Sequence, residues 1–270
     1  MFEPKLGVSL HTISGELTRE LYEALRASAI TTVEITARCF TGQSGDVEKS
    51  ALNRALLEAG IQAASIHALF GPQYDFCVLD GDAHERAIDV AISAIDLAAE
   101  FEAPLVVVHA SAEPIEAEER GERMAQARRA LAALSRRCQA TGTRIAIELL
   151  PRTCLGNTVD ELLELLDGLD PGTLGVCLDT NHLMDRHDSL PDDVRRLGDR
   201  LMATHLSDYD GVDEKHELPG TGVVDWAGAM AALRDIDYRG PFNYECKLDG
   251  DTPEERIAVV EGNFEWLCGL

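Results

Sequence analysis

Short apolar runs alternate with longer amphipathic stretches along the whole chain. The apolar runs are five to seven residues long. Most carry apolar residues at successive positions, as strands buried on both faces of a parallel sheet do. They read KLGVSL, TVEIT, IQAASIH, PLVVVH, RIAIEL, LGVCLD, LMATHL and PFNYE. The pattern therefore predicts eight strands, each separated from the next by a segment long enough to hold a helix.

Five of the intervening segments have apolar residues at helical spacing. These are residues 16–28, 83–101, 116–140, 159–166 and 225–236. Three of them begin at a side chain of the type that caps a helix N-terminus, namely Asp82, Thr158 and Asp225. Gly142 follows the third segment, where a left-handed residue can end a helix. We expect amphipathic helices that cover the predicted sheet.

The predicted strand ends are evenly spaced. They fall near residues 11, 36, 67, 109, 148, 179, 205 and 245, about 33 residues apart, which suits one βα unit each. Eight such units in 270 residues predict a (β/α)8 TIM barrel as a single domain spanning residues 1–270. An open doubly wound sheet is the alternative, but no Gly-x-Gly-x-x-Gly turn of a dinucleotide fold follows the first strand.

Seven of the eight predicted strands end in a histidine or a carboxylate. The residues are His11, His67, His109, Glu148, Asp179, His205 and Glu245. In a barrel these ends converge on the C-terminal face, where active sites form. Imidazole nitrogens and carboxylate oxygens are ligands of zinc, manganese, cobalt and iron ions. The pattern therefore predicts a metal site on that face.

The last four strands supply the most specific set of ligands. Glu148, Asp179, His205 and Glu245 would surround one divalent ion with three carboxylates and one imidazole. Three carboxylates favour a hard ion, so Mn²⁺ is the first expectation, with Mg²⁺, Co²⁺ and Zn²⁺ as alternatives. We expect His11 and His67 to orient neighbouring carboxylates rather than to bind the ion.

The same segments resemble a known superfamily. RIAIELLPR, GVCLDTNH, THLSDYDG and KHELPGTGVVDW, followed by Glu245, resemble in order the sugar isomerase/epimerase superfamily of xylose-isomerase-like TIM barrels. The resemblance implies that the four ligands hold one divalent metal and that Glu148 and Glu245 are the catalytic acid/base pair. It also implies that a metal-stabilised enediolate forms on a small sugar, polyol or keto-acid substrate, and that His182 contacts a substrate oxygen.

Three reactions share the first step of this chemistry. Removing a proton next to a carbonyl needs a base near the carbon and a cation near the developing oxyanion. Return of the proton on the opposite face gives epimerisation, return at the neighbouring carbon gives isomerisation, and loss of a β-hydroxyl gives dehydration of the inosose type. The sequence leaves all three open.

Further residues are candidates for substrate binding. They are His182, His216, Arg152 and His109. Three aromatic residues in the loop after the third strand are candidates for the wall of a sugar pocket, namely Phe70, Tyr74 and Phe76. The epimerases usually place an arginine several residues after the strand-seven histidine, whereas SDYDGVDEK contains none. This difference counts against strict ketohexose 3-epimerase activity.

A zinc-dependent AP endonuclease on the same scaffold is the alternative function. Most of that family's trinuclear zinc set has counterparts in His67, His109, Glu148, Asp179, His182, His205, His216 and Glu245. That family has Asp two residues before the loop histidine, where this chain has Glu214. The chain also carries 48 acidic against 24 basic residues, a formal charge of −24. This charge disfavours nucleic acid and anionic membrane surfaces as partners.

The cysteines and the N-terminus bear on the compartment. The seven cysteines are odd in number and form no Cys-x-x-Cys pair, which is typical of reduced thiols in the cytoplasm. No basic and apolar leader is visible, and the apolar runs are too short to span a bilayer. We expect Cys177 and Cys246 to fill the core, and His84 and His187 to be exposed. Barrels of this kind often pair, so a homo-oligomer stays open.

Overall fold

The predicted strands form a closed parallel barrel. The computed structural model describes residues 2–41 and 45–270. Within these residues the strands follow one another in sequence order, and β1 pairs with β8 to close the barrel. The strands are β1 Leu6–Ser9, β2 Thr32–Thr36, β3 Gln62–His67, β4 Leu105–Val108, β5 Arg144–Glu148, β6 Leu174–Asp179, β7 Leu201–Leu206 and β8 Phe242–Tyr244. The predicted (β/α)8 TIM barrel is confirmed.

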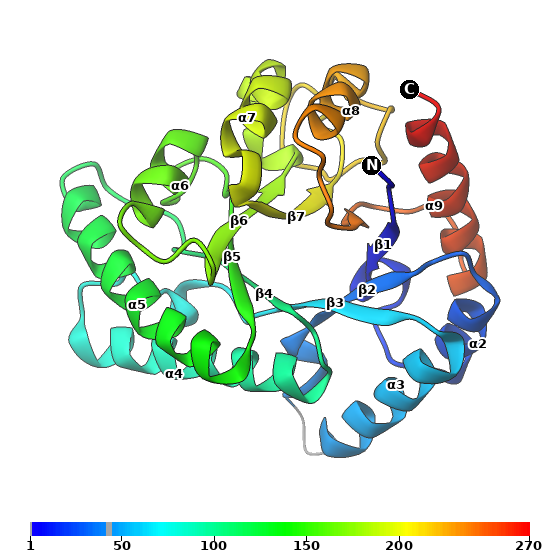
Figure 1. Ribbon diagram of the computed structural model, residues 1–270, viewed down its shortest axis with the longest axis horizontal. Helices are drawn as coiled ribbons and strands as arrows, with labels where there is room; N and C mark the ends of the chain where they lie inside the picture. Colours follow the sequence, from blue (N-terminus) through cyan, green and yellow to red (C-terminus); the bar gives the residue numbers. More distant parts are fainter. Residues whose placement is uncertain (1, 42–44) are drawn as a thin grey trace.

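Helices surround the barrel and connect its strands (Figure 1). The α-helices are α1 Leu10–Ile13, α2 Arg19–Ala27, α3 Gly45–Ala59, α4 Gly81–Glu100, α5 Arg120–Thr141, α6 Val159–Leu166, α7 Leu190–Leu197, α8 Trp226–Asp235 and α9 Pro253–Cys268. The 3₁₀ segments are η1 Ala37–Phe40, η2 Pro72–Tyr74, η3 Asn181–Ser189 and η4 Gly198–Arg200. Across the described ranges, no helix combines the length and the apolar character needed to cross a membrane.

Helix ends follow local sequence signals, with one correction. Thr158 and Asp225 cap α6 and α8 as predicted, because their side chains accept hydrogen bonds from backbone N–H groups of the first turn. The cap of α4 is Asp80 and not the predicted Asp82. Helix α9 has no counterpart in the prediction, although Thr252 begins it with a capping box.

Alternate strand residues face the helices and the barrel interior. Val106, Val108, Ile145 and Ile147 are buried in the main hydrophobic cluster. Each such side chain contributes about 1.5–3 kcal/mol by leaving water. A second cluster consists of the interior residues Leu105, Val107, Ala146, Cys177 and Ala203. Below the polar strand ends, this part of the barrel interior is therefore lined by apolar side chains, several of them small.

Three predictions about single histidines are wrong. One concerns His187, which is half-buried rather than exposed, with its side chain 21% accessible. His11 does not end β1, which stops at Ser9, and it lies in the short helix α1. His84 is buried rather than exposed, and its Nδ1 lies 2.8 Å from the carbonyl oxygen of Phe76. The expected core positions of Cys177 and Cys246 are confirmed, since both thiols are free and buried.

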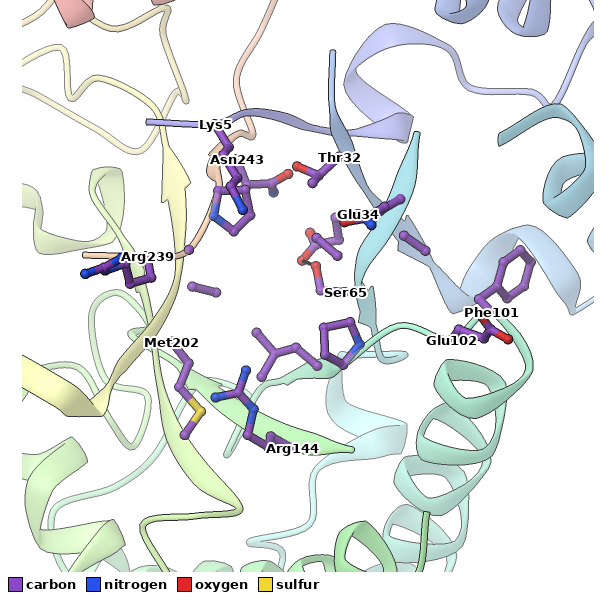
Figure 2. A pocket seen from close by; sticks show the side chains of 18 of the residues that line it. Lys5, Thr32, Glu34, Ser65, Phe101, Glu102, Arg144, Met202, Arg239 and Asn243 are labelled. Carbon is purple, nitrogen blue, oxygen red and sulfur yellow. Dashed lines mark hydrogen bonds between the residues drawn. The ribbon is translucent and has the colours of Figure 1, made fainter. Parts of the chain in front are cut away.

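A cavity of about 800 Å³ opens at the N-terminal end of the barrel (Figure 2). Its rim includes Lys5 before β1 and Arg144 at the start of β5. Interior residues of β2, β3 and β8 line it further in, among them Glu34, Ser65 and Asn243. TIM barrel interiors are usually filled by layers of large side chains. Here part of the interior is open on the face opposite the predicted site.

Candidate metal centre

The four predicted ligands lie together at the C-terminal face of the barrel. Glu148 ends β5, Asp179 ends β6, His205 lies in β7, and Glu245 directly follows β8. One potential ligand atom from each of them lies within 4.8 Å of the others. The strand order explains this proximity, because neighbouring parallel strands bring their carboxyl ends to one edge.

His205 is the centre of this group. Its Nδ1 lies 3.2 Å from Oε1 of Glu148 and 2.5 Å from Oε2 of Glu245. Its Nε2, on the other side of the ring, lies 3.1 Å from Oε1 of Glu34. His205 is fully buried, so these carboxylates are its immediate electrostatic surroundings.

Two carboxylate oxygens of the group accept no hydrogen bond of regular geometry among the described residues. They are Oδ2 of Asp179 and Oε2 of Glu245, and the second of these lies 2.5 Å from Nδ1 of His205. Asp179 is completely buried, and a buried charged oxygen without a partner costs several kcal/mol. A divalent cation between the four side chains would satisfy both oxygens. The donor set of carboxylate oxygens and imidazole nitrogen fits Mn²⁺, Mg²⁺, Co²⁺ and Zn²⁺.

The charges of the two glutamates are fixed by neighbouring histidines. Burial alone would raise the pKa of Glu148, but His109 and His205 hold it well below its usual range. Burial would likewise raise the pKa of Glu245, but His205 lowers it. Asp179 differs, because burial raises its pKa above the ordinary value. Both glutamates are therefore ionised at neutral pH. Asp179 is the carboxylate of the group whose ionised form is disfavoured by burial.

His67 and His109 contact the other oxygen of Glu148. Their Nε2 atoms lie 3.1 Å and 3.0 Å from its Oε2. His67 Nδ1 faces the carbonyl oxygen of Ala68 at 2.9 Å, an arrangement that directs Nε2 toward the site. Burial alone would lower the pKa of His67, but Glu148 raises it to about 9. These three side chains form a second cluster with metal-binding geometry.

A third cluster lies beside Asp179. His182 Nδ1 faces the carbonyl oxygen of Leu149 at 2.8 Å, and its Nε2 lies 3.4 Å from Oε1 of Glu214. His216 Nε2 lies 3.4 Å from the same oxygen. Asp179, His182 and His216 also meet the geometric requirement for a metal site. In the sequence Glu214 is notable only as a departure from the endonuclease pattern, whereas in the structure its Oε1 lies 3.4 Å from Nε2 of both histidines.

The loop that carries Glu214 and His216 is anchored by Asp208. This fully buried carboxylate accepts hydrogen bonds from the backbone N–H groups of Gly220 and Val224, at 2.7 Å and 3.0 Å. It also accepts one from Nε1 of Trp226 at 2.8 Å. Every one of these bonds crosses the loop, so Asp208 joins the end of β7 to the start of α8.

The remaining candidates lie at the edge of the site. The Arg152 guanidinium forms ion pairs with Glu214 at 2.6 Å and with Asp213 at 2.9 Å. The side chain predicted to bind substrate is therefore already paired with carboxylates of the same chain. His11 is exposed, and its Nε2 lies 3.4 Å from Oε1 of Glu245. Phe70 stacks on His109 with ring centroids 4.6 Å apart.

The other two aromatic candidates differ from Phe70. Phe76 is buried in the hydrophobic core, and Tyr74 makes no ring contact with the site histidines among the described residues. Glu34 is the main residue that sequence reasoning missed. It lies in the strand TVEIT, and a carboxylate in the middle of a buried strand, two residues before the strand end, is itself a signal of an interior polar contact.

We expect metal affinity to rise with pH. Burial alone would lower the pKa of His205, but the carboxylates of Glu245, Glu34 and Glu148 raise it well above its ordinary value. In the metal-free protein Nδ1 is therefore protonated at neutral pH and must lose its proton to bind an ion. The dissociation constant for Mn²⁺ should fall from about pH 6 to about pH 8, with about one proton released per ion. Calorimetry in buffers of different ionisation enthalpy measures both, and a pH-independent affinity would contradict this assignment.

Comparison with known proteins places the chain in a family. The sequence profile of the xylose isomerase-like TIM barrel family matches residues 22–269. The chain belongs to this family. A solved structure of a D-tagatose 3-epimerase-like protein superposes with a TM-score of 0.82 at 20% identity, covering 98% of both chains. At this identity the superposition supports the fold alone.

Three curated relatives carry different activities. A D-psicose 3-epimerase of Enterocloster bolteae is 31% identical over 138 residues, which are 50% of this chain and 44% of that protein. A 3-dehydroshikimate dehydratase of Pseudomonas putida is 27% identical over 248 residues, 88% of this chain and 37% of that protein. A probable endonuclease 4 of Natronomonas pharaonis is 33% identical over 214 residues, 76% of this chain and 74% of that protein.

These relatives indicate which kinds of reaction occur in the family. The chain spans less than half the length of the epimerase and of the dehydratase it matches. The family therefore includes sugar epimerases and dehydratases, and this chain has a buried cluster of histidines and carboxylates consistent with a divalent metal site.

Proposed function

We propose that this protein is a divalent-metal-dependent isomerase or epimerase of a small sugar, polyol or keto-acid, and that it acts by proton transfer next to a carbonyl. The observation that carries the proposal is the contact of Glu148 and Glu245 with the same nitrogen of His205. The two glutamates come from β5 and β8, which are separated by two other strands of the barrel. They therefore reach one point from different strands of the barrel.

Each side chain has a role in this chemistry. A divalent cation held by Glu148, Asp179, His205 and Glu245 would supply positive charge near the substrate oxygens. One glutamate removes the proton next to the carbonyl, and its lowered pKa keeps it ionised and ready to accept. The other glutamate returns a proton to the opposite face, once it has taken one up from solvent or a substrate hydroxyl.

Substrate binding is assigned to the histidines around this pair. His182, His216 and His109 surround the carboxylates and present N–H groups to substrate oxygens. Phe70 offers an apolar ring face beside His109, which suits the C–H face of a sugar. Arg152 is better assigned to holding the loop of Glu214 than to binding a substrate anion, because it is already paired with Asp213 and Glu214.

The proposal is tested by hydrogen exchange with solvent. The Mn²⁺-loaded protein is incubated in D₂O with ketoses, inososes and hydroxypyruvate, and NMR detects deuterium at the carbon next to the carbonyl. At least one substrate class should exchange, and exhaustive chelation should stop the exchange. Exchange that survives complete metal removal would contradict the mechanism.

A phosphodiester hydrolase with several zinc ions is the second candidate. It is favoured by the two additional clusters, since backbone carbonyls orient His67 and His182 as they orient metal-binding histidines. The similarity to a probable endonuclease 4 points the same way. Metal analysis of the purified protein separates the candidates, because about one ion per chain supports proton transfer and about three support hydrolysis.

Charge favours the first candidate. The chain has a net charge of −24, and phosphodiester binding requires basic side chains along the track of the nucleic acid. The paired arginines 128–129, 136–137 and 195–196 lie on α5 and α7, in the outer ring of helices. They do not lie at the strand ends.

A further inference from the structure

Glu34 is a buried carboxylate in the middle of β2. Its side chain is 2% exposed and points into the barrel. Oε1 accepts a hydrogen bond from the hydroxyl of Ser9 at 2.6 Å, and Oε2 accepts one from the hydroxyl of Ser65 at 2.7 Å. These residues belong to β1 and β3, so both neighbouring strands hold Glu34 in place. Nothing in the proposed proton transfer uses this network directly.

The same carboxylate contacts the back of His205. Nε2 of His205 lies 3.1 Å from Oε1 and 3.2 Å from Oε2 of Glu34. The amide of Asn243 donates to the Ser9 hydroxyl at 3.2 Å, so the Ser9 proton is directed to Glu34. Glu34 is therefore an acceptor on both oxygens, and Nε2 of His205 is the nitrogen that keeps its proton when Nδ1 binds an ion. This leaves Nδ1 to face Glu148 and Glu245.

We infer that Glu34 is a positioning residue that fixes the tautomer and ring orientation of His205 and so presents Nδ1 to the divalent ion. The inference rests on the proposed function in one respect, namely that His205 binds the metal. A carboxylate behind a ligating imidazole strengthens it as a ligand, and loss of such a partner typically weakens metal binding about 10–100-fold. Glu34 acts through His205 and does not itself touch substrate.

The cavity at the N-terminal end of the barrel allows this inference to be tested by chemical rescue. Glu34, Ser65 and Asn243 line its inner part, and its mouth lies on the face opposite the metal centre. Figure 2 shows Glu34 and Ser65 side by side on one wall of this cavity. Removal of the Glu34 side chain would extend the cavity to Nε2 of His205. A small carboxylate such as formate would then have a route to that nitrogen without passing the metal.

The experiment compares Mn²⁺ binding by the full-length chain in five forms: wild type, Glu34→Gln, Glu34→Ala, Thr32→Val and His205→Ala. Thr32 lines the same cavity, and its hydroxyl donates a long hydrogen bond of 3.5 Å to the carbonyl oxygen of Leu6, so Thr32→Val is the matched control. Mn²⁺ affinity is measured by electron paramagnetic resonance, and the absorption spectrum of the Co²⁺-loaded protein reports the ligand geometry. Circular dichroism verifies that each variant is folded.

We expect Glu34→Ala to weaken Mn²⁺ binding about 10–100-fold, and Glu34→Gln to weaken it less because the amide oxygen still accepts from Nε2. Formate should restore affinity and the Co²⁺ spectrum in Glu34→Ala, whereas potassium chloride at equal ionic strength should not. Formate should not restore His205→Ala. Thr32→Val should bind Mn²⁺ as the wild type does.

Two results would overturn the inference. One is that both Glu34 variants bind Mn²⁺ as tightly as Thr32→Val does. The other is that Glu34→Ala loses affinity, Glu34→Gln does not, and formate has no effect, which would show that Glu34 only fills space. Failure of the proposed function looks different, since wild type and His205→Ala would then bind Mn²⁺ equally or not at all.

Discussion

Glu148→Gln and Glu245→Gln should each slow solvent exchange of the substrate C–H proton by about 10²–10⁴-fold, while the barrel stays folded. Glutamine has nearly the shape of glutamate but cannot accept the proton as a base. The reduction should persist at Mn²⁺ concentrations that fill the site, because it comes from the lost base as well as from a lost ligand. NMR of the exchanging substrate in D₂O measures the rate, and the bound metal is determined in the same samples.

Glu20→Gln is the control for this pair of variants. Glu20 lies in the first turn of α2, belongs to none of the clusters of candidate metal ligands, and has an exposed side chain. It should exchange the substrate proton at the wild-type rate. Wild-type rates in both Glu148→Gln and Glu245→Gln would refute the assignment of these glutamates as the acid/base pair.

Asp179→Asn should make the metal-free protein more stable and should abolish the stabilisation that metal provides. Burial raises the pKa of Asp179, which means that the folded protein disfavours its ionised form at neutral pH. Asparagine removes that charge and keeps an oxygen for the N–H groups of Asn181 and His182. We expect a gain of about 1–2 kcal/mol in the metal-free free energy of unfolding.

The cost of Asp179→Asn to stability appears only when metal is added. At a metal concentration 100 times the dissociation constant, binding stabilises a folded protein by about 2.7 kcal/mol, and Asp179→Asn should lose this increment. Calorimetric unfolding with chelator and with Mn²⁺ measures both changes. Asp208→Asn is the matched control, since Asp208 is equally buried but has partners for its oxygens. It should be less stable than wild type and keep the metal-dependent increment, and the reverse pattern would contradict our account of Asp179.

The strands could be predicted closely because the barrel buries them on both faces. The runs TVEIT, LGVCLD and LMATHL coincide with β2, β6 and β7. The period of about 33 residues then fixes the fold class with no knowledge of side-chain contacts. Strand ends were less certain where a helix begins at once, as at His11, because an apolar run does not distinguish the last strand residue from the first residue of α1.

The candidate site was predictable where its residues follow strand ends and not where loops bring them in. Glu148, Asp179 and His205 are placed by strand register alone. Glu214 depends on the path of a loop whose His216 has a positive φ of 51°. Sequence patterns do not reveal such a path, and for the same reason the pairing of Arg152 with Glu214 was not foreseen.

Glu34 shows a different limit. The alternation of strand residues places it on the same face as the strand-end residue Thr36, one layer deeper in the barrel. Its partner His205 lies in β7, five strands away in the sequence and across the closed barrel. Only the closure of the sheet brings the two together, so the contact has no local sequence signal.

The shortness of β8 has a consequence for the mechanical integrity of the barrel. This strand has three residues, and its register with β7 covers only two residue pairs. Glu245 follows it directly, while Glu148 and Asp179 extend from the longer strands β5 and β6. An ion shared by these carboxylates would act as a cross-link over the weakest part of the sheet. Loading of the metal would then add to the free energy that holds the already closed barrel together at β8.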